Sequence, residues 1–118
     1  MSAPPSGVRT PGRAFYERQV RLLMDGDARA LVEANYHPDA VAVTWAGIAR
    51  GHAELIPHFA GFLDRVQILE LVSTDRWSEG PDTIFFEATV RTNFGLGHVY
   101  DAFVLREGRA THHFTGEK

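Results

Sequence analysis

Apolar and charged positions in the first half of the chain follow the spacing of amphipathic helices. From Arg13 onward, apolar side chains return every three or four residues, with charged residues such as Arg18 turned outward between them. The segment Asp25-Gly26-Asp27 can end this first helix and cap a second one. The predicted helices cover residues 13–24, 28–35 and 52–63.

The remaining chain has the composition and alternation of β-strands. Five strands are expected, over residues 40–46, 66–78, 83–94, 99–105 and 109–115. The signals between them are a turn at Tyr36-His37-Pro38-Asp39, a loop over 47–51, Gly80-Pro81, Gly95-Leu96-Gly97 and Glu107-Gly108. Helices that come first and strands that come last indicate an α+β architecture with a mainly antiparallel sheet. We expect this sheet to curl around the three N-terminal helices as a cone that can enclose a ligand.

Length and composition are those of one globular domain. The chain has 118 residues, of which 44% are hydrophobic and 23% are charged. Residues 1–12 hold three prolines and two glycines and almost no large apolar side chain. We therefore expect a disordered N-terminal segment over residues 1–12, followed by a domain over residues 13–118.

Charge and residue usage exclude several function classes. A net charge of −3 without a run of Lys or Arg argues against nucleic-acid binding. The absence of cysteine excludes disulfides, thiolate zinc sites and cysteine nucleophiles, and the six histidines show no metal-ligand spacing. Because there is no apolar run of about 20 residues and no signal-peptide pattern, we expect a cytoplasmic protein without a membrane partner, a metal or a cofactor.

The last hairpin determines which side chains face the inside of the cone. If Arg106-Glu107-Gly108 is a three-residue loop, Asp101 lies opposite His113 and both face inward. A two-residue loop would turn Phe114 inward in place of His113, and a hairpin slipped by one residue would give the role of His113 to His112. The other face of these strands is apolar and suits a partner subunit in a homodimer. Its members are Tyr100, Ala102, Val104, Ala110, His112 and Phe114.

Four short motifs occur in an order that resembles a known superfamily. They are Asp25-Gly26-Asp27, Tyr36-His37-Pro38-Asp39-Ala40-Val41, Arg50-Gly51 and Asp101-Ala102-Phe103-Val104-Leu105-Arg106-Glu107-Gly108-Arg109. Together they resemble the nuclear transport factor 2-like superfamily over residues 13–118, and most of all its SnoaL-like polyketide cyclases and ketosteroid isomerases. The resemblance implies the cone-shaped fold, whereas functions in the superfamily range from isomerases and cyclases to non-enzymatic binders.

Catalytic positions of the two enzyme groups map unevenly onto this chain. In ketosteroid isomerases the second oxyanion donor is a protonated aspartate, which Asp101 matches. Their first-strand carboxylate base falls on Thr44 and their first-helix tyrosine on Gln19, so these two positions differ. SnoaL-like cyclases place an acid/base aspartate on the late strands near a histidine of the final strand, and Asp101 and His113 match that arrangement.

The residues and the resemblance together indicate a cofactor-independent acid/base enzyme. It would be a cyclase or isomerase acting on an apolar enolisable carbonyl compound such as a polyketide intermediate. Asp101 would move the proton, His113 would tune or relay it, and Gln19 would help to hold the enolate. The substrate would be contacted by Tyr16, Thr44, Phe59, Phe86, Val90 and Phe103. The alternative, favoured by the missing first-strand base, is a non-catalytic module of the same fold that binds a small apolar ligand or dimerises.

Overall fold

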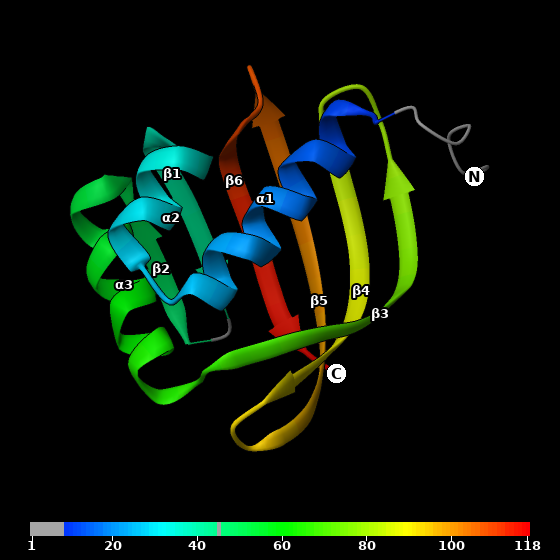
Figure 1. Cartoon of the computed structure of the whole chain (residues 1–118). Coiled ribbons are helices and arrows are strands. Elements are labelled where there is room, and N and C mark those ends of the chain that lie inside the picture. The colour runs from blue at the N-terminus through cyan, green and yellow to red at the C-terminus, as the bar shows by residue number, and fades with distance from the viewer. Residues whose placement is uncertain (1–8, 45) are drawn as a thin grey trace.

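One curved sheet carries three helices on its concave face (Figure 1). The computed structural model describes residues 9–44 and 46–118. In chain order the elements are α1 (Pro11–Asp25), α2 (Ala28–Asn35), β1 (Tyr36–Thr44), β2 (Gly47–Arg50), α3 (Gly51–Arg65), β3 (Ile68–Glu79), β4 (Thr83–Thr92), β5 (Gly95–Arg106) and β6 (Arg109–Glu117). The strand order is β2-β1-β6-β5-β4-β3, and only the β1–β6 pair is parallel. The predicted class, α+β with three helices on a curved and mainly antiparallel sheet, is confirmed.

The limits of α1 follow from its capping residues. The Thr10 hydroxyl accepts a hydrogen bond from a backbone N–H of the first turn, and Gly26 ends the helix with a left-handed φ of 74°. The helix starts at Pro11, earlier than predicted, because proline is favourable in a first turn. Of the segment predicted to be disordered, residues 1–8 lie outside the described residues and residues 11–12 belong to α1.

The segment around Pro38 is a strand and not the predicted turn. β1 begins at Tyr36, and its pairing with β6 shifts between Tyr36 and Val41. This irregularity accommodates Pro38, which has no N–H to donate to a ladder. The loop predicted over residues 47–51 is also wrong, because Gly47–Arg50 forms β2 and pairs with β1.

The long strands begin and end within a few residues of their predicted limits, except at the start of β5. The turn expected at Gly95-Leu96-Gly97 belongs to that strand, since Thr92 pairs with Gly95 and the turn falls on residues 93–94. The β4–β5 ladder is therefore regular along its whole length.

The turn between β5 and β6 is one residue shorter than predicted. Arg106 pairs with Arg109, which leaves Glu107 and Gly108 as a two-residue loop. Both loop residues have positive φ, 55° and 78°, as a type I′ hairpin requires.

A β-bulge next to this turn preserves the predicted inward face. The register shifts beside Thr111, so that Phe103 pairs with His113 and Asp101 pairs with Thr115. The predicted Asp101–His113 pairing is thus wrong, but Asp101 and His113 still share the concave face. The extra residue at Thr111 cancels the change of side that a two-residue loop would have caused.

The same bulge corrects the list of outward-facing residues. Tyr100 and Phe114 are exposed on the convex face as predicted. Ala110 lies before the bulge, pairs with Leu105 and is fully buried, so its assignment to the convex face was wrong.

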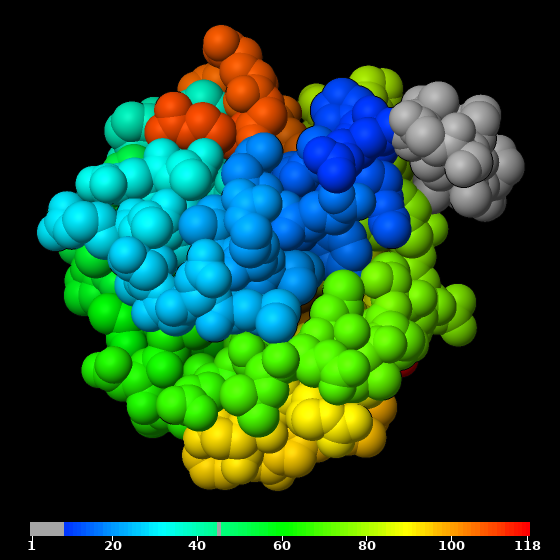
Figure 2. Space-filling model, viewed as in Figure 1, coloured from blue at the N-terminus to red at the C-terminus, as the bar shows by residue number. Residues whose placement is uncertain are grey.

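The hydrophobic core lies between the helices and the concave face. Phe15 on α1, Leu55 on α3 and Phe103 on β5 are among its most deeply buried side chains, at 0 to 2% exposure. In the space-filling view α1 lies across the middle of the molecule, with α2 beside it (Figure 2). Within residues 9–44 and 46–118, no helix is long and apolar enough to cross a membrane.

Candidate functional site

Asp101 and His113 form a close polar pair on the concave face. The Nε2 atom of His113 lies 2.7 Å from Oδ1 of Asp101, and the two side chains are 4% and 14% exposed, respectively. His112, the neighbouring residue on β6, points to the other face and is exposed. The bulge therefore selects His113 over His112 as the histidine that meets Asp101.

Aromatic rings hold the imidazole of His113 in a fixed plane. The ring of Phe103, its cross-strand partner, stacks on it at a centroid distance of 4.0 Å and an angle of 17°. Phe59 of α3 lies nearly parallel to it at 6.3 Å. Both rings are apolar and pack on the faces of the imidazole. They leave its two ring nitrogens available for hydrogen bonds in the plane of the ring.

The second ring nitrogen contacts Tyr36, a residue predicted to lie in a turn. The Tyr36 hydroxyl is 2.9 Å from Nδ1 of His113, and the side chain is fully buried. Burial raises the pKa of Tyr36 far above its ordinary value, so the phenol stays protonated. No periodic signal marks Tyr36 as a site residue, because Pro38, two positions later, is a turn signal.

Three further polar side chains extend this contact behind Tyr36. Gln19 Nε2 donates to the Tyr36 hydroxyl at 3.0 Å, and Asn35 Nδ2 donates to Gln19 Oε1 at 2.7 Å. Arg18 Nε donates to Asn35 Oδ1. Arg18 therefore does not point only to solvent, as its place between apolar residues suggested. Gln19 reaches the Asp101–His113 pair only through Tyr36, and a role in holding an enolate would act along that path.

Two predicted contact residues pack beside Asp101. Phe86 is its direct cross-strand neighbour on β4, and the ring of Tyr16 lies 4.5 Å from that of Phe86. The Tyr16 hydroxyl is 2.7 Å from Oγ1 of Thr74, and burial raises the pKa of Tyr16 despite this hydrogen bond. The predicted aromatic residues thus surround the pair with apolar surface.

Thr44 and Val90 lie farther away on the same face. Thr44 shares a row of the sheet with Thr115 and Asp101, but its hydroxyl contacts the carbonyl oxygen of Gly47 at 3.3 Å. Val90 is four positions beyond Phe86 on β4 and is half-buried. Neither contacts the Asp101–His113 pair through a hydrogen bond or ring.

Burial on the concave face falls from the His113 row toward the β4–β5 turn. The neighbours of His113 in its row, Ala42, Phe103 and Ile84, are at most 2% exposed. Most residues farther along are half-buried, namely Leu71, Thr74, Val90 and Val99 on the strands and Ile56 and Leu63 on α3, whereas Ala88 on β4 is still buried. Asp101 lies at the boundary. In the part of the chain that the structure describes, its Oδ2 has no hydrogen-bond partner.

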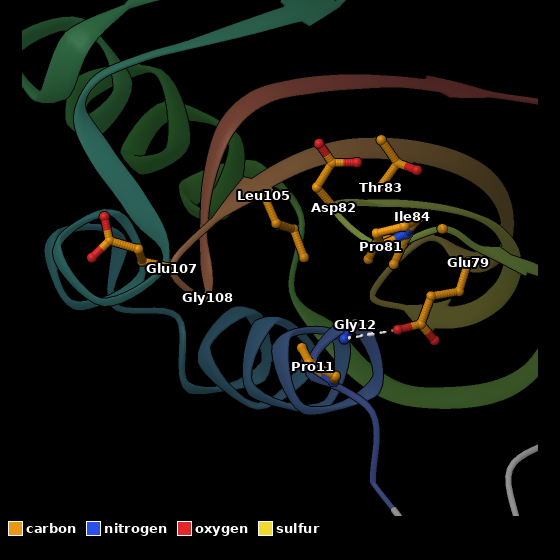
Figure 3. Close-up of a pocket in the computed structure, with 11 residues that line it drawn as sticks. Pro11, Gly12, Glu79, Pro81, Asp82, Thr83, Ile84, Leu105, Glu107 and Gly108 are labelled. Atoms are coloured by element: carbon orange, nitrogen blue, oxygen red, sulfur yellow. Dashed lines mark hydrogen bonds between the residues drawn. The ribbon is translucent and has the colours of Figure 1, made fainter.

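A separate cleft of about 280 Å3 lies between the start of α1 and the β3–β4 and β5–β6 turns (Figure 3). Glu79 points toward α1 there and accepts hydrogen bonds from the N–H of Gly12 at 3.0 Å and from Thr10 Oγ1 at 2.8 Å. None of the predicted site residues is among its described lining residues. Within the described ranges, no three His, Asp or Glu side chains gather as metal ligands.

Comparison with known proteins assigns the fold. No protein-family model and no curated protein sequence matches this chain significantly. Among solved structures, it is similar to a nuclear transport factor 2-like protein of Anabaena variabilis, with a TM-score of 0.77 and 16% identity over 100% of this chain and 94% of the other. The chain has the nuclear transport factor 2-like fold, as its motifs predicted.

Two other similar structures are those of a candidate enzyme and of a protein crystallised with an organic acid. A candidate polyketide cyclase of Sinorhizobium meliloti has a TM-score of 0.73 and 15% identity over 87% of this chain and 94% of the other. TerC, crystallised with polyporic acid, has a TM-score of 0.73 and 17% identity over 92% of each chain. Identities this low establish a shared fold and leave function to be argued from the site.

Proposed function

We propose that this protein is a cofactor-independent cyclase or isomerase in which Asp101 acts as general base on an apolar, enolisable carbonyl compound. The observation that carries the proposal is the position of Asp101. One oxygen contacts His113, and the other has no hydrogen-bond partner among the described residues; the carboxyl group lies at the boundary between a buried aromatic core and half-buried apolar surface. A carboxylate with one oriented oxygen and one free oxygen is suited to proton transfer.

The proposed reaction needs only the carboxylate and the substrate. Oδ2 of Asp101 removes the proton from the carbon next to the carbonyl, and the electron pair of the broken C–H bond moves into the carbonyl as an enolate. In an isomerase, Asp101 returns the proton to another carbon; in a cyclase, the enolate carbon attacks a second carbonyl of the substrate and the proton passes to the resulting alkoxide. The structural similarity to a candidate polyketide cyclase supports this substrate class.

Substitution of Asp101 by Asn tests the proposal, because it keeps shape and removes the base. The assay is exchange of α-carbon protons for deuterium in D2O, followed by NMR over a panel of enolisable ketones, together with a ligand-binding titration. We expect Asp101→Asn to bind as the wild type does and to exchange at least about 10²-fold more slowly. Asp75→Asn, which alters a carboxylate on the convex face, is the matched control and should change neither measurement.

The opposite outcome identifies the alternative function. Thr44 stands where related isomerases carry a base, which favours a binding module. If bound ketones exchange at the same rate in Asp101→Asn and wild type, or in neither, the catalytic proposal fails and the protein is a ligand-binding module.

We further propose that two copies pair through the convex face. One row of side chains crosses five strands there and is apolar throughout: Ile48, Val43, Phe114, Ala102 and Phe85. Ile48, Phe114 and Phe85 are 56%, 42% and 38% exposed. Contiguous apolar surface of this kind is typical of an interface, and a second copy supplies a self-complementary partner.

A further inference from the structure

The hydrogen bonds behind His113 have a direction, and Arg18 sets it. A guanidinium group donates hydrogen bonds and accepts none. Its contact with Asn35 Oδ1 therefore turns Nδ2 of Asn35 toward Gln19, where Oε1 accepts at 2.7 Å. Gln19 must in turn present Nε2 to the Tyr36 oxygen at 3.0 Å. Neither amide can flip without bringing two donors or two acceptors together.

This direction determines where the proton of the imidazole lies. Because the Tyr36 oxygen accepts from Gln19, its own proton is free to point at Nδ1 of His113, 2.9 Å away. Nδ1 is then an acceptor, and the ring proton belongs on Nε2. That nitrogen lies 2.7 Å from Oδ1 of Asp101, which can only accept while it is ionised.

We propose that Arg18, acting through Asn35, Gln19 and Tyr36, holds His113 as the neutral tautomer protonated at Nε2, so that Asp101 alone is left to take the substrate proton. The four residues are positioning residues. The final clause rests on the proposed function, whereas the tautomer does not.

Burial makes this direction hard to reverse. Gln19 is 3% exposed and Asn35 and Tyr36 are fully buried, so water is not available to replace a lost partner. A second proton on His113 would sit on Nδ1 and point at Tyr36. The phenol would then accept two hydrogen bonds, and its own proton would have no acceptor.

The other titratable groups near His113 come from three elements. Oδ1 of Asp101 on β5 lies beside Nε2 of His113, and the Tyr36 hydroxyl lies beside Nδ1. His58 on α3 is also near His113, and burial is the main cause that lowers the pKa of His58. Tyr36 on β1 stays a neutral phenol.

The sharpest test reverses the direction of the hydrogen bonds that run from Arg18 to Tyr36. In Asn35→Asp, both carboxylate oxygens accept, one from Arg18 and one from Gln19, which must turn its Nε2 around. Gln19 Oε1 then faces Tyr36 and accepts a hydrogen bond from its hydroxyl, and the Tyr36 oxygen accepts from Nδ1–H of His113. Since Asp101 still accepts at Nε2, we expect His113 to carry protons on both nitrogens. The added negative charge at residue 35 is balanced by the imidazolium.

The readout is the two-bond 1H–15N spectrum of protein labelled at histidine, recorded at about pH 7.5, above the ordinary imidazole pKa of about 6.5. The signals of His113 are identified by their loss in His113→Gln. We expect one protonated nitrogen, Nε2, in the wild type and two in Asn35→Asp. Gln19→Glu also makes residue 19 accept a hydrogen bond from the Tyr36 hydroxyl, and it repeats the test if Asn35→Asp does not fold. Asn93→Asp adds the same charge at an exposed turn and should leave the His113 spectrum unchanged.

A wild-type spectrum with a proton on Nδ1 would overturn the proposal. So would wild-type signals that persist in a folded Asn35→Asp or Gln19→Glu protein. The spectrum needs no substrate, so this result is separate from the exchange assay: unimpaired exchange in Asp101→Asn would end the proposed function and leave the tautomer assignment intact.

Discussion

The sheet carries an aspartate, a histidine and a hydroxyl group on each of its faces. On the concave face, Asp101 contacts His113, which contacts a buried phenol. On the convex face, the Thr89 hydroxyl donates to Oδ2 of Asp75 at 2.7 Å and lies 3.0 Å from Nδ1 of His98. The residue types are almost the same, and the two groups differ in burial and in which atoms remain free.

Asp75 is an exposed aspartate, and both of its carboxylate oxygens accept hydrogen bonds. Oδ1 accepts from Ser73 at 2.6 Å and Oδ2 accepts from Thr89. These hydrogen bonds, that of Ser73 first, hold the pKa of Asp75 below its ordinary value of 3.8. A carboxylate stabilised in this way is a weak base. Asp101, whose Oδ2 has no hydrogen-bond partner within residues 9–44 and 46–118 and lies beside apolar surface, is the better placed of the two to accept a proton.

The largest expected effect concerns the difference in burial. Phe103→Ala removes a ring that is 2% exposed and stacks on His113, so it should lower the free energy of unfolding by about 3–5 kcal/mol. Phe94→Ala, at a ring that is 77% exposed, should cost less than about 1 kcal/mol. Urea denaturation measures both. Equal losses would mean that the concave face is not the packed core described above.

A smaller effect is expected from the convex face, if that face binds a second copy. Val104→Asp places a carboxylate in the apolar surface and should weaken dimerisation by about 2–3 kcal/mol. Light scattering at micromolar concentration should then give the mass of one chain for the variant and of two for the wild type. Ala53→Asp, on the exposed side of α3, is the control and should remain dimeric. A monomeric wild type would rule out the interface.

The smallest expected effect is the pH dependence of the Asp75 group. Because the pKa of Asp75 is lower in the folded protein than its ordinary value, the unfolded chain binds more protons between the two values. Asp75 therefore adds stability above about pH 4, and this contribution is lost as the pH falls through the folded pKa. The difference in unfolding free energy between wild type and Asp75→Asn, measured from about pH 6 to pH 2, should shrink toward zero. A difference that grows on acidification would contradict the assignment.

Periodicity predicted the elements well because each buries one regular face. The helical spacing after Arg13 and the alternation of the late strands are set by which side chains the core must take up. The errors fall where local signals competed with tertiary pairing. Pro38 is a turn signal by itself, yet β6 holds its surroundings as a strand.

The candidate site was predictable in part. Asp101 and His113 could be found because an acidic and a basic side chain among inward-facing apolar positions are conspicuous, and their side of the sheet was right although their pairing was wrong. Arg18, Asn35 and Tyr36 could not, since hydrogen bonds between separate elements leave no periodic trace in a sequence. Such contacts depend on side-chain direction, which only the folded arrangement supplies.

The bulge at Thr111 also bears on how the chain can vary in length. Its hydroxyl donates to the carbonyl oxygen of Val104 at 3.2 Å, which fastens one surplus residue to an otherwise continuous ladder. Loss of a single residue here would straighten β6 and leave Phe103 opposite His113. The β4–β5 ladder contains no such surplus, so the same loss there would displace Phe86 from Asp101. Descendants of this sequence can therefore shorten at one end of the site far more freely than at the other.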